Sequence, residues 1–166
     1  MAAADYLLSA RTPLLAQNGV AALLLLRDGR YVLQLRSAKP SIWYPGHWGL
    51  FGGAVDRGER PLAALRRELR EELEYEPRAP EYFSRFDFDL SSVGQGKVSR
   101  TFFLVAVTQG EFRRFRLHEG DAVAAFRPAE VFDGRRLMPY DAYALWLHHA
   151  RRRLQKAGPR RKESRP

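Results

Sequence analysis

The sequence has no cysteine among its 166 residues. Disulfide bonds and thiolate metal sites are therefore excluded. No apolar run is long enough to cross a membrane, and the first residues, Met1 to Leu8, lack the basic segment that opens a signal peptide. No internal repeat is visible. These absences, together with a length typical of one domain, predict a single cytoplasmic domain that does not enter a membrane.

Positive charge exceeds negative charge, but only near the C-terminal end. The chain carries 28 Lys and Arg against 19 Asp and Glu, a formal net charge of +9. Residues 151–166 hold eight of these basic residues and one acidic residue, so the rest of the chain is at only about +2. Basic ends of this kind are more often solvated than bound to nucleic acid. We expect one domain over residues 1–154, a basic, flexible tail over 155–166, and no nucleic acid among the main partners.

Apolar runs and turn residues predict a mixture of strands and helices. Gly19 to Leu26 is a nearly continuous apolar run, which is typical of a strand buried on both faces. Asp28-Gly29 then predicts a tight turn into the next strand. We expect strands over 19–26, 31–35, 48–51, 82–90, 98–108 and 123–126, a strand or rigid loop over 112–117, a helical turn over 128–132, a helix from Pro139, and a short leader over 1–17.

A glycine-rich loop followed by a helix carries the most informative residues. Pro61 suits the first helical position, where its missing N–H costs little. Leu62, Leu65, Leu69 and Leu73 then recur at spacings of three and four. This stripe predicts a helix that packs one face against the core.

Three glutamates lie beside that stripe. Glu68, Glu71 and Glu72 fall within an arc of roughly 100° around the helix. Like charges at these spacings destabilise a helix by a few tenths of a kcal/mol per pair, so a cation is expected to hold them together. Oxygen-only ligands suit Mg²⁺ or Mn²⁺. The alternative is a solvated helix face on which the neighbouring arginines pair with the glutamates.

The loop and helix together resemble the Nudix box, the signature of the Nudix hydrolase family. Gly53, five residues, Glu59, seven residues and then Arg67-Glu68-Leu69-x-Glu71-Glu72 match that box at each spacing. The resemblance extends through Tyr75 and departs from the family where Glu74 stands in place of the usual glycine. Glutamate is a poor residue for the left-handed conformation at a helix end. The acidic cluster itself is intact.

The resemblance implies a fold and an activity. The fold is the α/β/α sandwich of the Nudix family, with a mixed central sheet. The activity is that of a Mg²⁺-dependent pyrophosphohydrolase, in which metal-activated water cleaves a nucleoside diphosphate linked to another moiety, and Mn²⁺ can replace Mg²⁺. The partner is then a small nucleotide diphosphate substrate of the nucleoside triphosphate or nucleotide sugar class. Family members are often dimers, so a homodimer is compatible with the resemblance.

It also implies roles for individual residues. A later glutamate that precedes a glycine binds metal in some members of the family, and Glu119 resembles it. The general base stays open between a box glutamate and Glu119. The residues expected to act in catalysis are Glu68, Glu71, Glu119 and Arg67. The expected metal ligands are Glu68, Glu71, Glu72, Glu119 and the backbone carbonyl of Gly52. Glu59 and Gly53 are expected to support the site.

Aromatic residues are the candidates for substrate binding. Trp43 and Tyr44 lie in a proline- and glycine-containing loop, and Tyr140 follows Pro139. Such rings most often pack in a core or a lid, and stacking on a nucleobase is the alternative. The extra sequence marks of several Nudix subfamilies are absent or altered, so the substrate is predicted only as a class. A nucleotide-binding or regulatory module without hydrolysis, or an RNA 5′-end pyrophosphohydrolase recruited through the basic tail, remain as alternatives.

Overall fold

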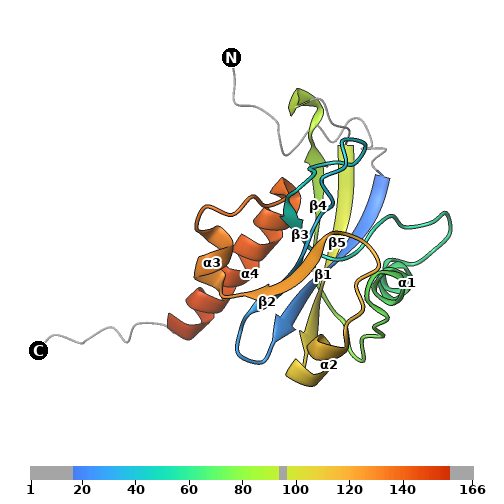
Figure 1. Ribbon diagram of the computed structural model, residues 1–166. Coiled ribbons are helices and arrows are strands. Elements are labelled where there is room, and N and C mark those ends of the chain that lie inside the picture. Colours follow the sequence, from blue (N-terminus) through green and yellow to red (C-terminus); the bar gives the residue numbers. More distant parts are fainter. Residues whose placement is uncertain (1–16, 94–96, 158–166) are drawn as a thin grey trace, which may run out of the picture.

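The protein folds as one mixed sheet with helices on both faces (Figure 1). The computed structural model describes residues 17–93 and 97–157. Of the expected leader over 1–17 and tail over 155–166, residues 1–16 and 158–166 lie outside the described residues, while Gln17 belongs to β1 and 155–157 to α4. The strands are β1 Gln17–Leu26, β2 Tyr31–Leu35, β3 Trp48–Gly49, β4 Glu81–Asp89, β5 Lys97–Val107 and β6 Ala122–Phe126; the helices are α1 Pro61–Leu73, α2 Gln109–Arg114, α3 Pro128–Phe132 and α4 Pro139–Ala157, with a 3₁₀ turn at Ser91–Val93.

Strand β1 lies at the centre of the sheet. It runs parallel to β5 over its whole length and antiparallel to β2 near its end. Its side chains alternate between two apolar cores: Val20, Ala22 and Leu24 pack on one face, and Ala21 and Leu23 pack on the other. The prediction of a strand buried on both faces is therefore confirmed, and it explains why this segment reads as a continuous apolar run.

The remaining strands complete a mixed sheet. Strand β4 pairs with β5 at one edge, and β2 is bordered by β6 on one side and by β1 and β3 on the other. Figure 1 shows α1 on one face of the sheet and α3 and α4 on the opposite face. The expected α/β/α sandwich is confirmed. In the part of the chain that the structure describes, no helix is long and apolar enough to span a membrane.

Three local predictions were wrong. Residues 112–117 form no strand: α2 covers Gln109–Arg114, because Thr108 and Glu111 form a capping box that begins a helix. The strand expected over 48–51 is paired with β2 only at Trp48–Gly49, since Phe51 turns away to bridge β1. Leu62 lies in the first turn of α1 and is 40% exposed, so the apolar stripe begins one turn later than predicted.

Candidate functional site

Two glycines bring the chain across the start of β1 and towards α1. Gly52 has a φ of +128°, and a Cβ there would lie 2.3 Å from the carbonyl oxygen of Val20. A Cβ on Gly53 would lie 2.6 Å from the carboxyl carbon of Glu68. Only glycine leaves room for these approaches. The Gly53 carbonyl accepts the Val20 N–H at 2.9 Å, whereas no backbone N–H of the described residues donates to the Gly52 carbonyl.

The glutamates of α1 face this glycine loop to different extents. Glu72 is 5% exposed, and its Oε2 accepts the Gly52 N–H at 2.9 Å. Burial raises the pKa of Glu72 to about 8, and the nearby charges of Glu119 and Glu68 act in the same direction. Burial also raises the pKa of Glu68, against the opposing effect of Arg67. The side chain of Glu71 is 60% exposed. Two buried carboxyl groups and one solvated carboxylate therefore share one helix edge.

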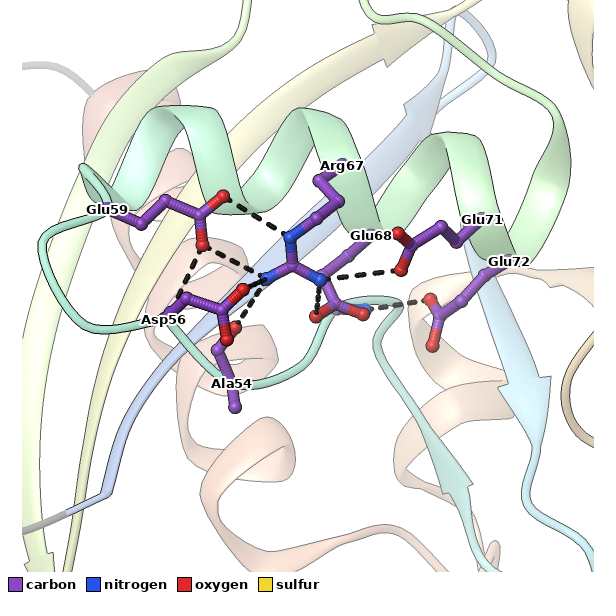
Figure 2. A network of polar contacts seen from close by, with 8 residues as sticks. Ala54, Asp56, Glu59, Arg67, Glu68, Glu71 and Glu72 are labelled. Atoms are coloured by element: carbon purple, nitrogen blue, oxygen red, sulfur yellow. Dashed lines mark hydrogen bonds and ion pairs between the residues drawn. The ribbon is translucent and has the colours of Figure 1, made fainter.

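Arg67 joins the loop to this edge (Figure 2). Its guanidinium group donates to both oxygens of Glu59, at 3.3 and 3.0 Å, and to the carbonyl oxygen of Ala54 at 2.9 Å. Its other terminal nitrogen donates to Glu68 at 2.7 Å and to Glu71 at 3.4 Å. Hydrogen bonding to Arg67 lowers the pKa of Glu59. All five nitrogen-bound protons point into one network, which a planar guanidinium can supply and an ammonium group cannot.

The sequence predicted only part of this network. The spacing of Arg67 and Glu71 predicted their contact, which is present but is the longest of the five. Glu59 lies eight residues before Arg67, and no helical spacing joins them. Their pairing arises because the loop over 54–60 folds back along the first turns of α1, as Figure 2 shows.

Glu119 comes to the same region from the loop between α2 and β6. The backbone N–H of His118 donates to the Glu72 carbonyl at 3.0 Å, which fixes this loop to the end of α1. The next residue, Glu119, is exposed, and its charge contributes to the raised pKa of both Glu68 and Glu72. A Cβ on Gly120 would lie 2.7 Å from the Leu35 carbonyl oxygen, so glycine is needed to turn the loop into β6. The structure thus brings Glu119 close to the α1 glutamates.

The donor set of this region fits a hard divalent cation. The groups are carboxylate oxygens and the Gly52 carbonyl, the ligand types that Mg²⁺ and Mn²⁺ prefer. The second oxygen of Glu72, Oε1, accepts no hydrogen bond from the described residues. Within residues 17–93 and 97–157, no three such side chains already converge on one point, because Arg67 holds Glu68 and Glu71. A cation would have to compete with Arg67 for these two carboxylates.

Helix α1 ends at Glu74, the position where the sequence departs from the Nudix box. Glu74 adopts the left-handed conformation, with φ 53° and ψ 36°, although it is not glycine. Its N–H donates to the Arg70 carbonyl, which is the 5→1 bond of the αL motif, and the Tyr75 N–H donates to the Leu69 carbonyl. His118 Nε2 also donates to Glu74 Oε1 at 2.7 Å. Glutamate therefore closes the helix as glycine would, at a conformational cost.

The predicted substrate-binding aromatics lie across the sheet from α1. The Tyr44 and Tyr140 rings meet edge to face, with 6.2 Å between their centroids. Tyr140 is 5% exposed, and the Arg100 guanidinium lies 4.9 Å from its ring centroid. Little of the Tyr140 face is therefore free for stacking. Trp43 is 37% exposed, and its backbone carbonyl accepts the Arg36 Nε–H at 2.9 Å.

Sequence reasoning missed a buried ion pair beside these rings. Arg100 of β5 and Asp141 of α4 are 8% and 0% exposed, and 3.5 Å separates Nε from Oδ1. Neither of these two atoms has a hydrogen-bond partner within the described residues. The other oxygen, Oδ2, accepts the Leu50 N–H at 2.8 Å. Burial raises the pKa of Asp141, and the charge of Arg100 opposes that shift. The sequence shows that both positions are charged, but no local spacing connects them, so it does not predict their contact.

Comparison with known proteins identifies the family. The family model of the NUDIX domain matches residues 16–155. The chain belongs to this family. Among curated Nudix relatives, the nucleoside triphosphatase NudI of Escherichia coli is 46% identical over 57 residues, which cover 34% of this chain and 40% of NudI. The chain thus aligns with less than half the length of that relative.

Solved structures share the fold over most of the chain. The MutT NUDIX hydrolase of Burkholderia pseudomallei has a TM-score of 0.66 and 25% identity, and the match covers 79% of this chain and 96% of that protein. The ORF135 protein of E. coli has a TM-score of 0.65 and 29% identity, with 86% and 93% covered. The mixed sheet between helices is therefore the Nudix fold.

Proposed function

We propose that this chain is a metal-dependent Nudix hydrolase that cleaves the diphosphate linkage of a nucleoside diphosphate derivative. Mg²⁺ is the proposed cofactor, and Mn²⁺ can replace it. One observation carries the proposal: Glu68 and Glu72 both face the Gly52-Gly53 loop, with Glu72 bonded to it and Glu68 filling the space that a Cβ would occupy. Glu68 is paired with Arg67, whereas the buried Glu72 makes no ion pair within the described residues. A buried carboxyl group without a matching cation is costly, so Glu72 supports a site for positive charge beside the loop.

Each residue of the site has a separate proposed task. Glu68, Glu71, Glu72, Glu119 and the Gly52 carbonyl would hold the cation. When bound, a divalent cation shields the diphosphate and lowers the pKa of water. Arg67 and Glu59 are positioning residues, because Arg67 fixes Glu68 and Glu71 while Glu59 fixes Arg67. Gly53 keeps the space that Glu68 needs.

The proton acceptor is proposed to be Glu119. It is exposed, and it accepts no hydrogen bond from the described residues, so its carboxylate is available to take a proton from water. Glu71 is the second candidate, since its side chain is 60% exposed and its contact with Arg67 is the longest in the network. Glu68 and Glu72 are more deeply buried and are better suited to holding the cation.

The nucleoside part of the substrate is assigned to the aromatic residues on the side of the sheet opposite α1. Trp43 and Tyr44 provide aromatic surface, and the Tyr140 ring contacts that of Tyr44 edge to face. The relative NudI is named as a nucleoside triphosphatase. We therefore propose a nucleoside triphosphate first, and a nucleotide sugar second, as the substrate.

A panel of substrates tests the proposal. Nucleoside triphosphates, nucleotide sugars and 5′-triphosphorylated RNA are incubated with Mg²⁺, with Mn²⁺ or with EDTA, and phosphate and pyrophosphate release are measured. Glu71→Gln and Glu72→Gln should each abolish metal-dependent turnover while the circular dichroism spectrum stays unchanged. Glu81→Gln is the matched control, because Glu81 is exposed at the start of β4 and makes no ion pair among the described residues.

The same panel separates the alternatives. Undiminished turnover in both glutamine variants would reject the proposed site. Nucleotide binding without hydrolysis under every condition would instead favour a binding or regulatory module. For the RNA alternative, the chain is shortened after Ala157, where α4 ends. A steep, salt-dependent loss that affects only RNA would favour that activity.

A further inference from the structure

A second hollow lies at the opposite end of the parallel strand pair. Strands β1 and β5 are parallel and end at Leu26 and Val107. Two adjoining cavities, of about 320 and 220 Å³, open beyond these ends. In open α/β sheets, ligands bind outside the carboxyl ends of parallel strands. The residues that line both cavities are Tyr75, Arg78, Glu111 and Arg114, and we call this hollow the α2 cavity.

The α2 cavity is separate from the carboxylate site. The glycine loop contacts β1 at Val20 and Ala21, whereas Arg27, which lines the larger cavity, follows the last residue of β1. Six residues of extended strand separate Ala21 from Arg27, which corresponds to about 20 Å at about 3.3 Å per residue. The two regions come nearer at the end of α1, where Glu72 lies three residues before Tyr75, but none of the carboxylate-site residues lines either cavity.

Positive charge dominates the lining of the larger cavity. Arg27, Arg78 and Arg114 all line it, and none forms an ion pair within the described residues. The larger cavity is lined by one carboxylate, that of Glu111. Its Oε2 already accepts hydrogen bonds from the N–H and the hydroxyl of Thr108. The pKa of Glu111 is lowered by these bonds first, and also by the charges of Arg78 and Arg114. Three guanidinium groups thus surround one carboxylate that is already bonded.

Two further carboxylates, Glu74 and Glu76, line the smaller cavity and have partners of their own. Glu76 pairs with Arg66 and Arg70, on the outer side of α1. Glu74 accepts a hydrogen bond from His118. Because neither glutamate lines the larger cavity, the excess of positive charge lies there, where three arginines stand against Glu111 alone.

The cavity also presents a neutral donor. Tyr75 is 8% exposed and lines both cavities, and its hydroxyl has no hydrogen-bond partner among the described residues. Burial raises the pKa of Tyr75 to about 12, so the hydroxyl keeps its proton at neutral pH. A protonated hydroxyl next to guanidinium groups suits a ligand with several acceptor oxygens.

We propose that the α2 cavity binds a phosphate group through Arg27, Arg78 and Arg114, at a site independent of the carboxylate site. Guanidinium groups recognise phosphate through paired N–H donors, and the three arginines approach the cavity from three different segments of the chain. The phosphate can come from an inorganic ion, such as phosphate or pyrophosphate, or from a nucleotide. Both sources share the chemistry that the cavity recognises.

Calorimetric titration of the full chain in EDTA tests the proposal. EDTA removes divalent cations, and the titration is repeated with Glu71→Gln, so a failure of the proposed enzymatic function would leave the result unaffected. The titrants are inorganic phosphate, pyrophosphate, a nucleoside monophosphate and the same nucleoside without phosphate. The phosphorylated titrants should bind and the nucleoside should not. Equal affinity for inorganic and nucleotide phosphate would assign the site to the ion, and at least tenfold tighter nucleotide binding would assign it to nucleotides.

Charge-removing variants locate the binding. Arg78→Ala and Arg114→Ala should each weaken pyrophosphate binding at least fivefold. Arg113→Ala, its matched control on α2, should change binding less than twofold, because Arg113 is exposed and does not line the cavity. The basic C-terminal end is present in every variant, so affinity that stays constant across all three would place the anion elsewhere and overturn the proposal. Absence of binding to the unaltered chain would also overturn it. Thermal unfolding confirms that each variant is folded.

Discussion

The carboxyl carbon of Glu68 lies 2.6 Å from the position that a Cβ of Gly53 would occupy. Gly53→Ala should therefore displace Glu68 and weaken its contact with Arg67. We expect kcat/KM to fall about 10- to 100-fold, since misplacement of a positioned group by about 1 Å has effects of this size. Steady-state kinetics with a substrate from the panel measure the change.

The control for this variant is Gly58→Ala in the same loop. Gly58 has a φ of +83°, and a Cβ there would meet no atom within 4 Å. Alanine at this position should cost about 1 kcal/mol of stability through backbone strain but leave kcat/KM nearly unchanged. If both variants lost activity equally, loop strain rather than the space for Glu68 would explain the effect.

Arg67→Lys tests the positioning network. Lysine keeps the charge but cannot bond both oxygens of Glu59 while also reaching Glu68 and the Ala54 carbonyl. We expect about a 10- to 100-fold loss in kcat or in metal affinity, as for other residues that orient ligands. Arg66→Lys is the matched control, since Arg66 pairs with Glu76 at the surface. Equal activity of the two variants would contradict a positioning role for Arg67.

Asp141→Asn tests the buried pair. The amide can still accept the Leu50 N–H, but it no longer neutralises Arg100. We expect a loss of about 1–3 kcal/mol in the free energy of unfolding, because a buried charge loses its partner. In urea unfolding, the double variant with Arg100→Met should lose clearly less than the sum of the single losses. Additive losses would show that the two side chains are not coupled.

His148 predicts a pH dependence of stability. Its Nδ1 and the Tyr31 hydroxyl oxygen are hydrogen-bonded at 2.7 Å, and burial, together with the charges of Arg152 and Arg151, lowers its pKa to about 4. In the unfolded chain the imidazole of His148 takes up a proton near pH 6.5, whereas in the folded chain it does so only near pH 4. The free energy of unfolding should therefore fall as the pH decreases from 6.5 towards 4. The full effect, from 6.5 to about 4 at about 1.36 kcal/mol per pH unit, is about 3 kcal/mol.

The comparison uses two histidine variants. His148→Gln should flatten the pH dependence between 6.5 and 4 relative to the unaltered chain, while His149→Gln, the next residue on α4, should preserve it. Urea midpoints at half-unit pH steps give the difference. An identical slope in both variants would show that His148 titrates normally in the fold.

Glu74→Gly should stabilise the protein. The left-handed conformation of Glu74 costs about 1–2 kcal/mol for a residue with a Cβ, and its hydrogen bond to His118 is largely exposed and contributes little. The gain expected in the free energy of unfolding is about 1 kcal/mol, and Glu74→Asn should give part of it. No gain in either variant would mean that the His118 contact offsets the strain.

The sequence was most informative where contacts are local. The strands at 31–35 and 123–126, the turn at Asp28-Gly29, and the helices from Pro61 and Pro139 follow from periodicity and turn chemistry. The gathering of Glu68, Glu71 and Glu72 on one edge also follows from helical spacing. The capping box that begins α2 is itself a local signal, but the apolar pattern over 112–117 outweighed it in the prediction.

The rest of the site depends on long-range packing. Glu59 meets Arg67 only because the loop folds back on α1, and Asp141 meets Arg100 only when α4 packs on β5. The burial of Glu72, which sets its raised pKa, likewise requires the Gly52 backbone to approach from another part of the chain. No periodicity within a single helix or strand predicts these contacts.

Strand β1 gives alternate side chains to the two apolar cores on either side of the sheet. A distortion of this strand therefore disturbs the packing of α1 and of α4 at the same time. Neither helix can detach while the other layer keeps its native packing. The protein should consequently melt in one cooperative transition, with the carboxylate edge and the aromatic side lost at the same temperature.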